Sequence, residues 1–389
     1  MDEHSEETID IADGVVVFAD DWGRHPSSCQ HLIRRLRERH KVLWVNTIGT
    51  RSPTVDSFTL FRGAEKFKSW SRGLQKVHEN MWVVDAPMLP GMGSRVSRFV
   101  SHKIVNSYLK ICLHRIGVKK PAMLTTLPHT GWLVGDIRQT QTIYYCTDDY
   151  SSWRGADQSS LIESEQQLVK NCSKILAVSK ALVERLSAAS ESVHHFSHAV
   201  DFELFSSAMR QSHKPRLEAY PSPRVGFFGL IYEKLDFELL AKLAKAINPA
   251  SLVMIGPIDF CDQRLKELEN VYFTDKVSYD ELPEWISGLD VLILPYLADD
   301  VMIRQSSPLK LRECLATGIP TVSVNVSEVK NYLPFVDIAD SHDEFIKMVR
   351  ACLESPERLE ARQNAVQSET WEHRSRQLEN YLKISLEQH

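Results

Sequence analysis

Several features that would assign a protein to a specialised class are scarce or missing in this chain of 389 residues. Its seven cysteines are scattered and form no Cys-x-x-Cys pair, which argues against a disulfide or zinc framework and favours a reducing compartment. No apolar run approaches the roughly 20 residues of a membrane span. Residues 1–7 are acidic and polar, unlike a signal peptide. We therefore expect a cytoplasmic protein.

Acidic residues are scarce in one region only. Residues 22–120 contain 19 lysines and arginines but five aspartates and glutamates, although the whole chain has a net charge of −5. A basic N-terminal surface on an otherwise acidic protein predicts an anionic partner. For any single basic cluster, a solvated helix face is the alternative interpretation.

Short apolar runs alternate with helical patterns along most of the chain, as is typical of buried parallel strands and the helices that connect them. The first series of strands is expected at 15–18, 42–45, 81–84, 123–125, 143–145 and 175–178, and the second at 225–228, 252–255, 271–273, 291–294 and 321–324. The sequence thus predicts an α/β protein with two Rossmann-like, doubly wound domains that face each other across a cleft.

The expected domain boundaries follow from a change in composition. Residues 206–223 are rich in serine and proline and are predicted to form a linker. The first domain would then span 1–205 and the second 224–369. A long amphipathic helix is expected at 370–386, and the terminal segment 370–389 is assigned to the first domain on the family resemblance described below.

Residues 306–322 form the most informative motif. Ser307 is a good N-cap, Pro308 suits the first helical position, and Gly318 is a good helix stop. The expected strand at 291–294 precedes the motif, so the start of the helix should lie where an α/β sheet binds ligands.

Two charged residues on this helix suggest its ligand. A lysine beside a free helix N-terminus, here Lys310, suits a phosphate group. Glu313, nearly one turn later, could accept hydrogen bonds from hydroxyl groups. The pair predicts a sugar phosphate or a nucleotide sugar, and the alternative is an ordinary amphipathic helix.

This motif resembles the donor-binding helix of GT-B glycosyltransferases, especially the family 4-like enzymes of bacterial cell-surface polysaccharide and teichuronic acid synthesis. That family often has two glutamates separated by seven residues. Glu313 matches the second, whereas Gln305 stands at the place of the first. The departure leaves open whether the enzyme retains or inverts the sugar's configuration.

The loop at 226–236 resembles the donor-phosphate loop of the same family. Gly229 would let backbone amides approach a phosphate, and Lys234 would supply a positive charge. The alternative is a tight turn with an exposed lysine.

Asp148 and Asp149 directly follow the expected strand at 143–145. A neighbouring like charge raises the pKa of one carboxyl group, which suits acid–base chemistry on an acceptor hydroxyl. We favour Asp149 as the base and Asp148 as its orienter or a helix cap. A purely structural turn is the alternative.

The resemblance implies two further contacts at the cleft. The loop after the first strand would face it, which makes Asp21, Trp22 and His31 candidates, with Asp21 preferred. The segment 198–201 resembles the x-Gly-Val-Asp turn of the family with Ala199 in place of glycine, and His198 could face the cleft.

Two basic segments of the first domain, 61–74 and 95–120, are interleaved with apolar residues. Such segments suit an anionic membrane surface. Nucleic acid is ranked lower, because no nucleic-acid-binding motif accompanies the charge. We expect a protein that can lie on the inner face of the cell membrane without a nucleic-acid partner.

Together these observations predict a glycosyltransferase that moves a sugar from a nucleotide-diphosphate sugar to a cell-surface polysaccharide or lipid-linked acceptor. The resemblance implies that Gly229, Lys234, Ser307 and Lys310 hold the diphosphate and that Glu313 holds a hydroxyl. Lysines and a helix N-terminus can stabilise the leaving diphosphate, so neither a metal ion nor a cofactor is expected. A nucleotide-sugar 2-epimerase and a non-catalytic nucleotide-sugar-binding protein remain alternatives.

Overall fold

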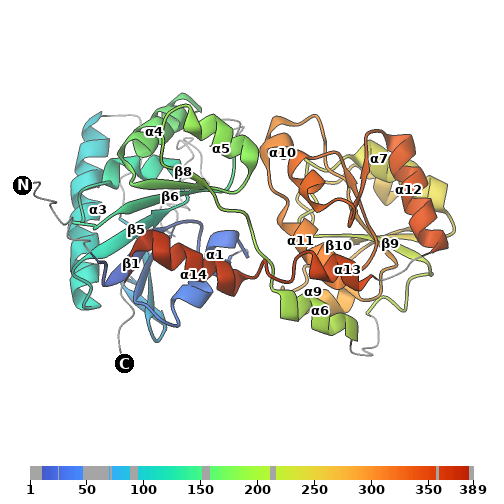
Figure 1. Cartoon of the computed structure of the whole chain (residues 1–389), viewed down its shortest axis with the longest axis horizontal. Coiled ribbons are helices and arrows are strands. Elements are labelled where there is room, and N and C mark those ends of the chain that lie inside the picture. Colours follow the sequence, from blue (N-terminus) through green and yellow to red (C-terminus); the bar gives the residue numbers. More distant parts are fainter. Residues whose placement is uncertain are drawn as a thin grey trace, which may run out of the picture. The chain divides into compact units, whose positions relative to one another are not determined.

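A computed structural model describes residues 11–24, 26–46, 70, 72–87, 95–150, 158–210, 216–355 and 359–384. The chain divides into two compact units (Figure 1). The first comprises Met1–Phe196 with Arg374–His389, and the second comprises Ser197–His373. Each unit is built on one sheet that is mainly or wholly parallel. The predicted α/β class with two Rossmann-like domains is confirmed.

The first unit contains a sheet of eight strands in the order β3-β4-β2-β1-β5-β6-β7-β8, in which only β3 and β4 pair antiparallel. The strands are β1 (Gly14–Phe18), β2 (Val42–Asn46), β3 (Gln75–His78), β4 (Met81–Asp85), β5 (Pro121–Thr125), β6 (Thr142–Cys146), β7 (Lys174–Ala177) and β8 (Val193–His195). Strands β1, β5 and β6 are buried along their whole length, as expected for parallel strands covered on both faces.

Helices connect these strands and cover the sheet. They are α1 (Ser28–Leu36), α3 (Arg95–Arg115), the 3₁₀ segment η1 (Pro128–Leu133), α4 (Gln158–Asn171) and α5 (Lys180–Ser187). Ser27 and Ser179 cap α1 and α5 by accepting hydrogen bonds from Gln30 N and Leu182 N. These caps fix where each helix leaves the carboxyl edge of the sheet.

The C-terminal helix α14 (Trp371–Leu382) contributes most of its length to the first unit. Glu379 forms an ion pair with Arg39 at 2.7 Å and contacts His40 at 3.1 Å. The ring of Tyr381 packs edge-on against Phe196. Residues 374–384 are therefore an integral part of the first unit, as the family resemblance implied for the terminal segment.

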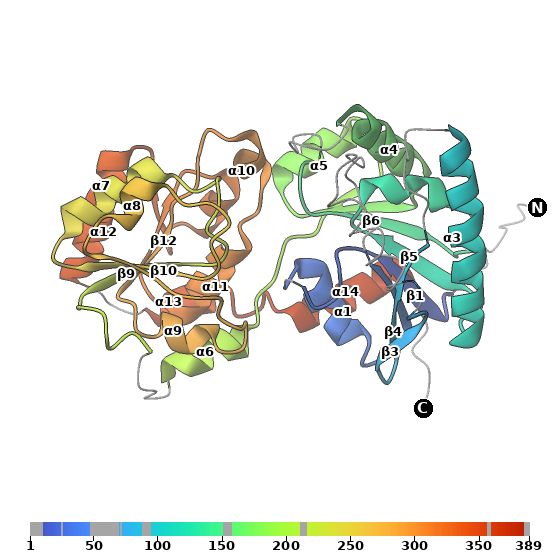
Figure 2. The ribbon, with the colours of Figure 1, turned by 180° about the vertical axis from the view of Figure 1, so that it is seen from behind.

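The second unit contains a parallel sheet of six strands in the order β11-β10-β9-β12-β13-β14. The strands are β9 (Arg224–Phe228), β10 (Ser251–Ile255), β11 (Val271–Phe273), β12 (Val291–Leu294), β13 (Thr321–Val324) and β14 (Asp337–Ala339). The helical segments are α6 (Phe202–Arg210), α7 (Phe237–Ile247), α8 (Gln263–Lys266), α9 (Leu282–Ile286), α10 (Val301–Gln305), α11 (Leu309–Thr317), η3 (Ser327–Tyr332), α12 (His342–Glu354) and α13 (Glu360–Asn364). Figure 2 shows α7 and α12 on one face of this sheet and α6, α9, α11 and α13 on the other.

The boundary between the two units follows Phe196, whereas the sequence predicted that the first domain extends to residue 205. Residues 197–210 belong to the second unit, because α6 buries Phe202 and Phe205 in its core. Leu217, within the predicted linker, is fully buried in the same core. Leu217 therefore belongs to the core of the second unit, although the serine and proline content of this region predicted a linker.

In both sheets the order of the strands reverses at one point, between β1 and β5 and between β9 and β12. Connections leave in opposite directions at such a switch point, which opens a crevice at the carboxyl edge where α/β proteins bind ligands. Loops at this edge carry most of the predicted site residues. No helix among the described residues is long and apolar enough to cross a bilayer.

Candidate functional sites

The loops after β9 and β12 lie side by side at the switch point of the second sheet. The backbone of Asp236 donates to Pro295 O at 2.8 Å, and that of Leu297 donates to Lys234 O at 2.9 Å. Nζ of Lys234 lies 2.6 Å from a carboxylate oxygen of Asp300, which also caps α10. Lys234 therefore joins two loops through an ion pair with Asp300, and its predicted contact with a phosphate stays a prediction.

Two glycines bring the ends of β9 and β10 into close contact. Gly229 has φ +119°, and its N–H donates to Ile255 O at 2.8 Å. Gly256 has φ +132°, and a Cβ there would lie 2.4 Å from Gly229 O. Only glycine adopts such φ values without strain and allows this approach. The two backbone segments can therefore lie against each other at the carboxyl edge of the sheet.

Lys310 lies in the space that Gly229 leaves. A Cβ on Gly229 would lie 2.1 Å from Cε of Lys310, so the lysine stem crosses directly over the glycine. Nζ of Lys310 lies 5.8 Å from the centre of the Phe227 ring. The partly exposed ammonium group is thus positioned at the first turn of α11, where the helix dipole adds positive potential.

Glu313 is buried beneath this lysine, and burial raises its pKa to about 7. The positive charge of Lys310 and a hydrogen bond with Tyr279 act in the opposite direction, and the negative charge of Asp201 adds to the rise. A carboxyl group with such a pKa can donate or accept a hydrogen bond near neutral pH, which suits recognition of a hydroxyl group.

Helix α11 begins at Leu309, and Pro308 occupies the N-cap position. The expectation that Ser307 caps this helix is wrong. Its buried hydroxyl accepts a hydrogen bond from Arg312 at 3.3 Å, and Arg312 forms an ion pair with Glu369 at 2.7 Å. The Ser307 hydroxyl therefore contacts a side chain of α11 itself, next to the start of this helix. Gly318 ends the helix with φ +74°, as predicted.

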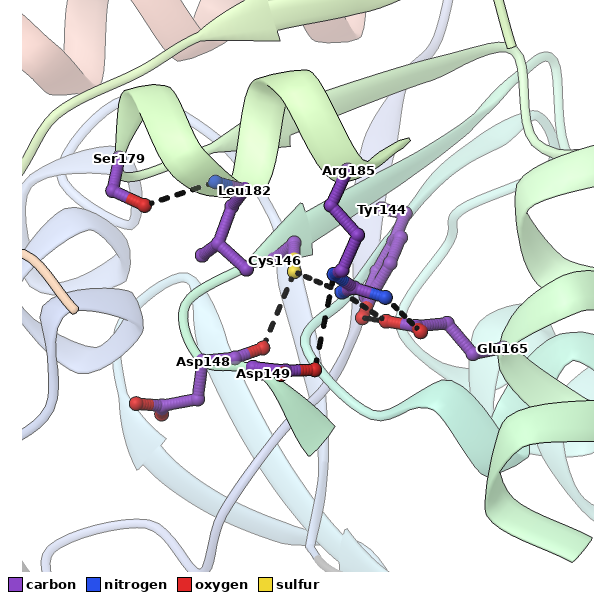
Figure 3. A network of polar contacts seen from close by, with 8 residues as sticks. All are labelled: Tyr144, Cys146, Asp148, Asp149, Glu165, Ser179, Leu182 and Arg185. Carbon is purple, nitrogen blue, oxygen red and sulfur yellow. Dashed lines mark hydrogen bonds and ion pairs between the residues drawn. The ribbon is translucent and has the colours of Figure 1, made fainter. Parts of the chain in front are cut away.

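Two adjacent acidic residues lie at the carboxyl edge of the first sheet. Asp148 and Asp149 follow β6, and their side chains diverge (Figure 3). Asp149 is buried, with Oδ1 at 3.8 Å from Nε of Arg185, whereas Asp148 is half-buried and its carboxylate points away from Arg185. Burial raises the pKa of Asp148 to about 6, with a further contribution from the charge of Asp149.

A buried network of polar contacts holds Asp149 in place. Arg185 contacts both carboxylate oxygens of Glu165, at 2.7 and 3.0 Å, and Glu165 accepts a hydrogen bond from the Tyr144 hydroxyl at 2.7 Å. Arg185 also lies 3.9 Å from Sγ of Cys146. The sequence analysis did not single out Arg185 or Glu165, since they are 20 residues apart on different helices.

The loop after β1 is organised around Asp20. Its carboxylate accepts hydrogen bonds from Ser27 at 3.0 Å and Gln30 at 2.6 Å, and burial raises its pKa. The preferred candidate, Asp21, is more exposed and makes a 3.7 Å ion pair with Arg24. Asp20 therefore orders the loop, and Asp21 lies on its surface.

The histidine candidates are buried. His31 is enclosed in α1, and burial together with Arg35 and Arg34 lowers its pKa to about 3. His198 is buried as well and belongs to the second unit, not to the first as predicted. Among the described residues, no group of three or more His, Cys, Asp and Glu side chains is arranged to hold a metal ion.

Part of the second unit matches a known protein family. Residues 222–355, which include β9 to α12, match the family described as Glycosyl transferases group 1. TuaH of Bacillus subtilis (strain 168), a candidate teichuronic acid biosynthesis glycosyltransferase, is 27% identical over 268 residues, which cover 63% of this chain and 67% of TuaH.

Solved structures share the whole architecture. Sucrose-phosphate synthase from Thermosynechococcus elongatus superposes with a TM-score of 0.68 at 12% identity, covering 95% of this chain and 98% of that one. HepE of Anabaena in complex with UDP-glucose gives a TM-score of 0.68 at 13% identity, covering 95% of this chain and 99% of HepE. Residues 222–355 are thus similar to a group 1 glycosyl transferase domain, and the chain shares the fold of its two units with sucrose-phosphate synthase and HepE.

Proposed function

We propose that the protein transfers a sugar from a nucleotide-diphosphate sugar to a cell-surface polysaccharide or lipid-linked acceptor. The observation that carries the proposal is the convergence of Gly229, Gly256 and Lys310 at the N-terminus of α11. Close backbone approach, a lysine and a helix dipole together form a site for a diphosphate.

In this proposal the second unit binds the donor. Lys310 and the first amides of α11 meet the diphosphate, and Glu313 meets a sugar or ribose hydroxyl. Lys234 orders the Gly229 loop through Asp300. Ser307 supports α11 through Arg312. Because HepE was crystallised with UDP-glucose, a UDP-sugar is the first donor to test.

We assign the general base to Asp148 and the supporting role to Asp149, which reverses the order inferred from the sequence. Asp149 is buried beside Arg185, whereas Asp148 is partly exposed at the carboxyl edge and has a pKa of about 6. A base with a pKa near the working pH accepts the acceptor's hydroxyl proton efficiently.

The proposed leaving-group stabilisation is electrostatic. As the bond to the sugar breaks, negative charge develops on the diphosphate, and Lys310 and the helix N-terminus are positioned to stabilise it. Transfer is accordingly expected without a metal ion or cofactor. Activity that survives dialysis against a chelator would support this step, and activity restored only by a divalent cation would refute it.

The acceptor assignment rests on the relative and on charge. TuaH is associated with teichuronic acid, a cell-surface polymer, and residues 22–120 of this chain are strongly basic. A basic first unit suits an acceptor presented at an anionic membrane. Most of the basic segment 61–74 that contributed to this expectation lies outside the described residues.

Purified protein should be incubated with radiolabelled UDP-sugars, other nucleotide sugars and a lipid extract. Label transferred to lipid or polymer supports the proposal. Isomerised nucleotide sugar would indicate a 2-epimerase, and binding without turnover a non-catalytic protein. A thermal-shift screen finds the donor first, because a ligand at ~100 times its Kd stabilises the protein by about 2.7 kcal/mol.

A further inference from the structure

Helix α3 exposes an apolar stripe to solvent. Phe99, Val100, Ile104 and Ile111 are 62%, 37%, 39% and 51% exposed. Val100, Ile104 and Ile111 are four and seven residues apart and therefore lie on one side of the helix. Of the six exposed large hydrophobic residues that the structure describes in the first unit, four are on α3.

This stripe is not the face that packs on the sheet. The opposite side of α3 buries its own apolar residues in the core of the first unit; they are Val105, Leu109, Cys112 and Leu113. The helix is therefore apolar on two sides, and only one of them is needed for folding. Figures 1 and 2 show α3 along an outer edge of the first unit.

The charged side chains that α3 itself carries have a single sign. Lys103, Lys110 and Arg115 are exposed beside it, and α3 contains no aspartate or glutamate. Nζ of Lys103 lies 5.6 Å from the centre of the Phe99 ring, so cationic and apolar groups are intermixed on one surface. A protein partner would have to match this arrangement with an acidic rim, whereas an anionic bilayer offers negative head groups above an apolar layer everywhere.

We infer that the outer face of α3, defined by Phe99, Val100, Lys103, Ile104, Lys110 and Ile111, docks on an anionic lipid bilayer. The inference deepens the proposed function, because it gives the surface through which a lipid-linked acceptor would be met. Helix α3 has 21 residues and would lie in the plane of the interface, with the apolar stripe entering the head-group region and the lysines above it. Nucleic acid fits less well, because isoleucine and valine offer no hydrogen bonds to phosphates or bases.

The test is co-sedimentation with vesicles of phosphatidylcholine alone and of phosphatidylcholine mixed with phosphatidylglycerol, at low and high salt. Wild-type protein should bind only the mixed vesicles, and salt should release it. Lys103→Gln combined with Lys110→Gln should weaken binding about 25-fold, since each basic residue contributes about fivefold. Ile104→Glu combined with Ile111→Glu should weaken it at least as much.

Leu333→Glu provides the matched control, because Leu333 is 55% exposed and lies in the second unit. It should bind vesicles as the wild type does. Circular dichroism checks that each variant folds. If the double isoleucine variant does not fold, vesicle binding by the double lysine variant still tests the inference. Equal binding by wild type and both α3 variants, or binding indifferent to lipid charge and salt, would overturn the inference. The inference would also be overturned if wild-type protein bound none of the vesicles, or bound an oligonucleotide more tightly than vesicles. UDP-sugar binding, measured by calorimetry without vesicles, tests the proposed function separately.

Discussion

Oδ1 of Asp149 lies 3.8 Å from Nε of Arg185 within the first unit, while the neighbouring carboxylate of Asp148 points the other way (Figure 3). Two adjacent acids thus occupy different environments: one is buried beside a cation and the other is partly exposed. Such a separation is how a pair of carboxyl groups acquires two roles.

Asp148→Asn should lower the rate of transfer by about 10²–10⁴-fold and leave donor affinity nearly unchanged, because a general base contributes about that much. Steady-state kinetics and calorimetry with the donor measure the two quantities. Loss of less than about tenfold would show that Asp148 is not the base.

The pH dependence of transfer should report the same group. A base must be deprotonated to act, and the pKa of Asp148 is about 6, so kcat should fall as the pH drops through about 6. Asp148→Asn should remove this acidic limb from whatever activity remains. An acidic limb that persists unchanged in the variant would assign it to another group.

Arg185→Met should destabilise the first unit by about 3 kcal/mol, because it leaves the buried carboxylate of Glu165 without its cation. Arg264→Met is the control, since the pair of Arg264 with Asp262 is exposed on the arginine side and its loss should leave stability nearly unchanged. Urea denaturation of the three proteins gives the comparison. Equal stability of both variants would contradict a structural role for the buried pair.

Lys310→Ala should weaken the binding of a nucleoside diphosphate more than that of the bare nucleoside, because its ammonium group lies at the N-terminus of α11. Calorimetry with both ligands measures the difference. Lys347→Ala, at an exposed lysine of α12, is the control and should change neither. An equal loss for both ligands in Lys310→Ala would reject the diphosphate contact.

Gly229→Ala should both strain the backbone and displace the stem of Lys310, which lies 2.1 Å from the position of the new Cβ. We expect a loss of about 1–3 kcal/mol in stability from strain and weaker binding of the diphosphate. Gly135→Ala separates the two effects, because Gly135 has φ +93° but no atom within 4 Å of the position that a Cβ would take. Normal diphosphate affinity in Gly229→Ala would show that Lys310 does not need this space.

Glu313→Gln should stabilise the protein at pH 8 and not at pH 4. Burial raises the pKa of Glu313 from 4.5 to about 7, so the folded state prefers the protonated form. That preference is fully present below pH 4.5 and is lost as the pH rises through about 7. The preference corresponds to on the order of 3 kcal/mol of folding stability. Glutamine cannot ionise, so the variant should not lose this stability as the pH rises. Thermal melts of both proteins across this pH range test it, and parallel curves would contradict it.

The sequence by itself determined the α/β architecture with its two parallel sheets. Buried parallel strands such as those at 225–228 and 291–294 are short apolar runs between turn residues, and that pattern is local. Gly318 marked the end of α11 for the same reason, since a left-handed residue is required there. The edge strands β3 and β14 were not predicted, because they have only four and three residues and neither contains a run of apolar residues long enough to be distinguished from a loop.

The contacts of the site residues were shown only by the tertiary structure. Ser307 looks like a helix cap in the sequence, but Pro308 occupies that position and the Ser307 hydroxyl contacts Arg312. The ion pair of Lys234 with Asp300, at 2.6 Å, could not be read from the sequence either. The order of Asp148 and Asp149 likewise depends on Arg185, which lies on a different helix. Ion pairs and burial depend on residues far apart in the chain. Residue types and spacing could therefore place these side chains at the carboxyl edge of each sheet, but could not show which side chains they contact.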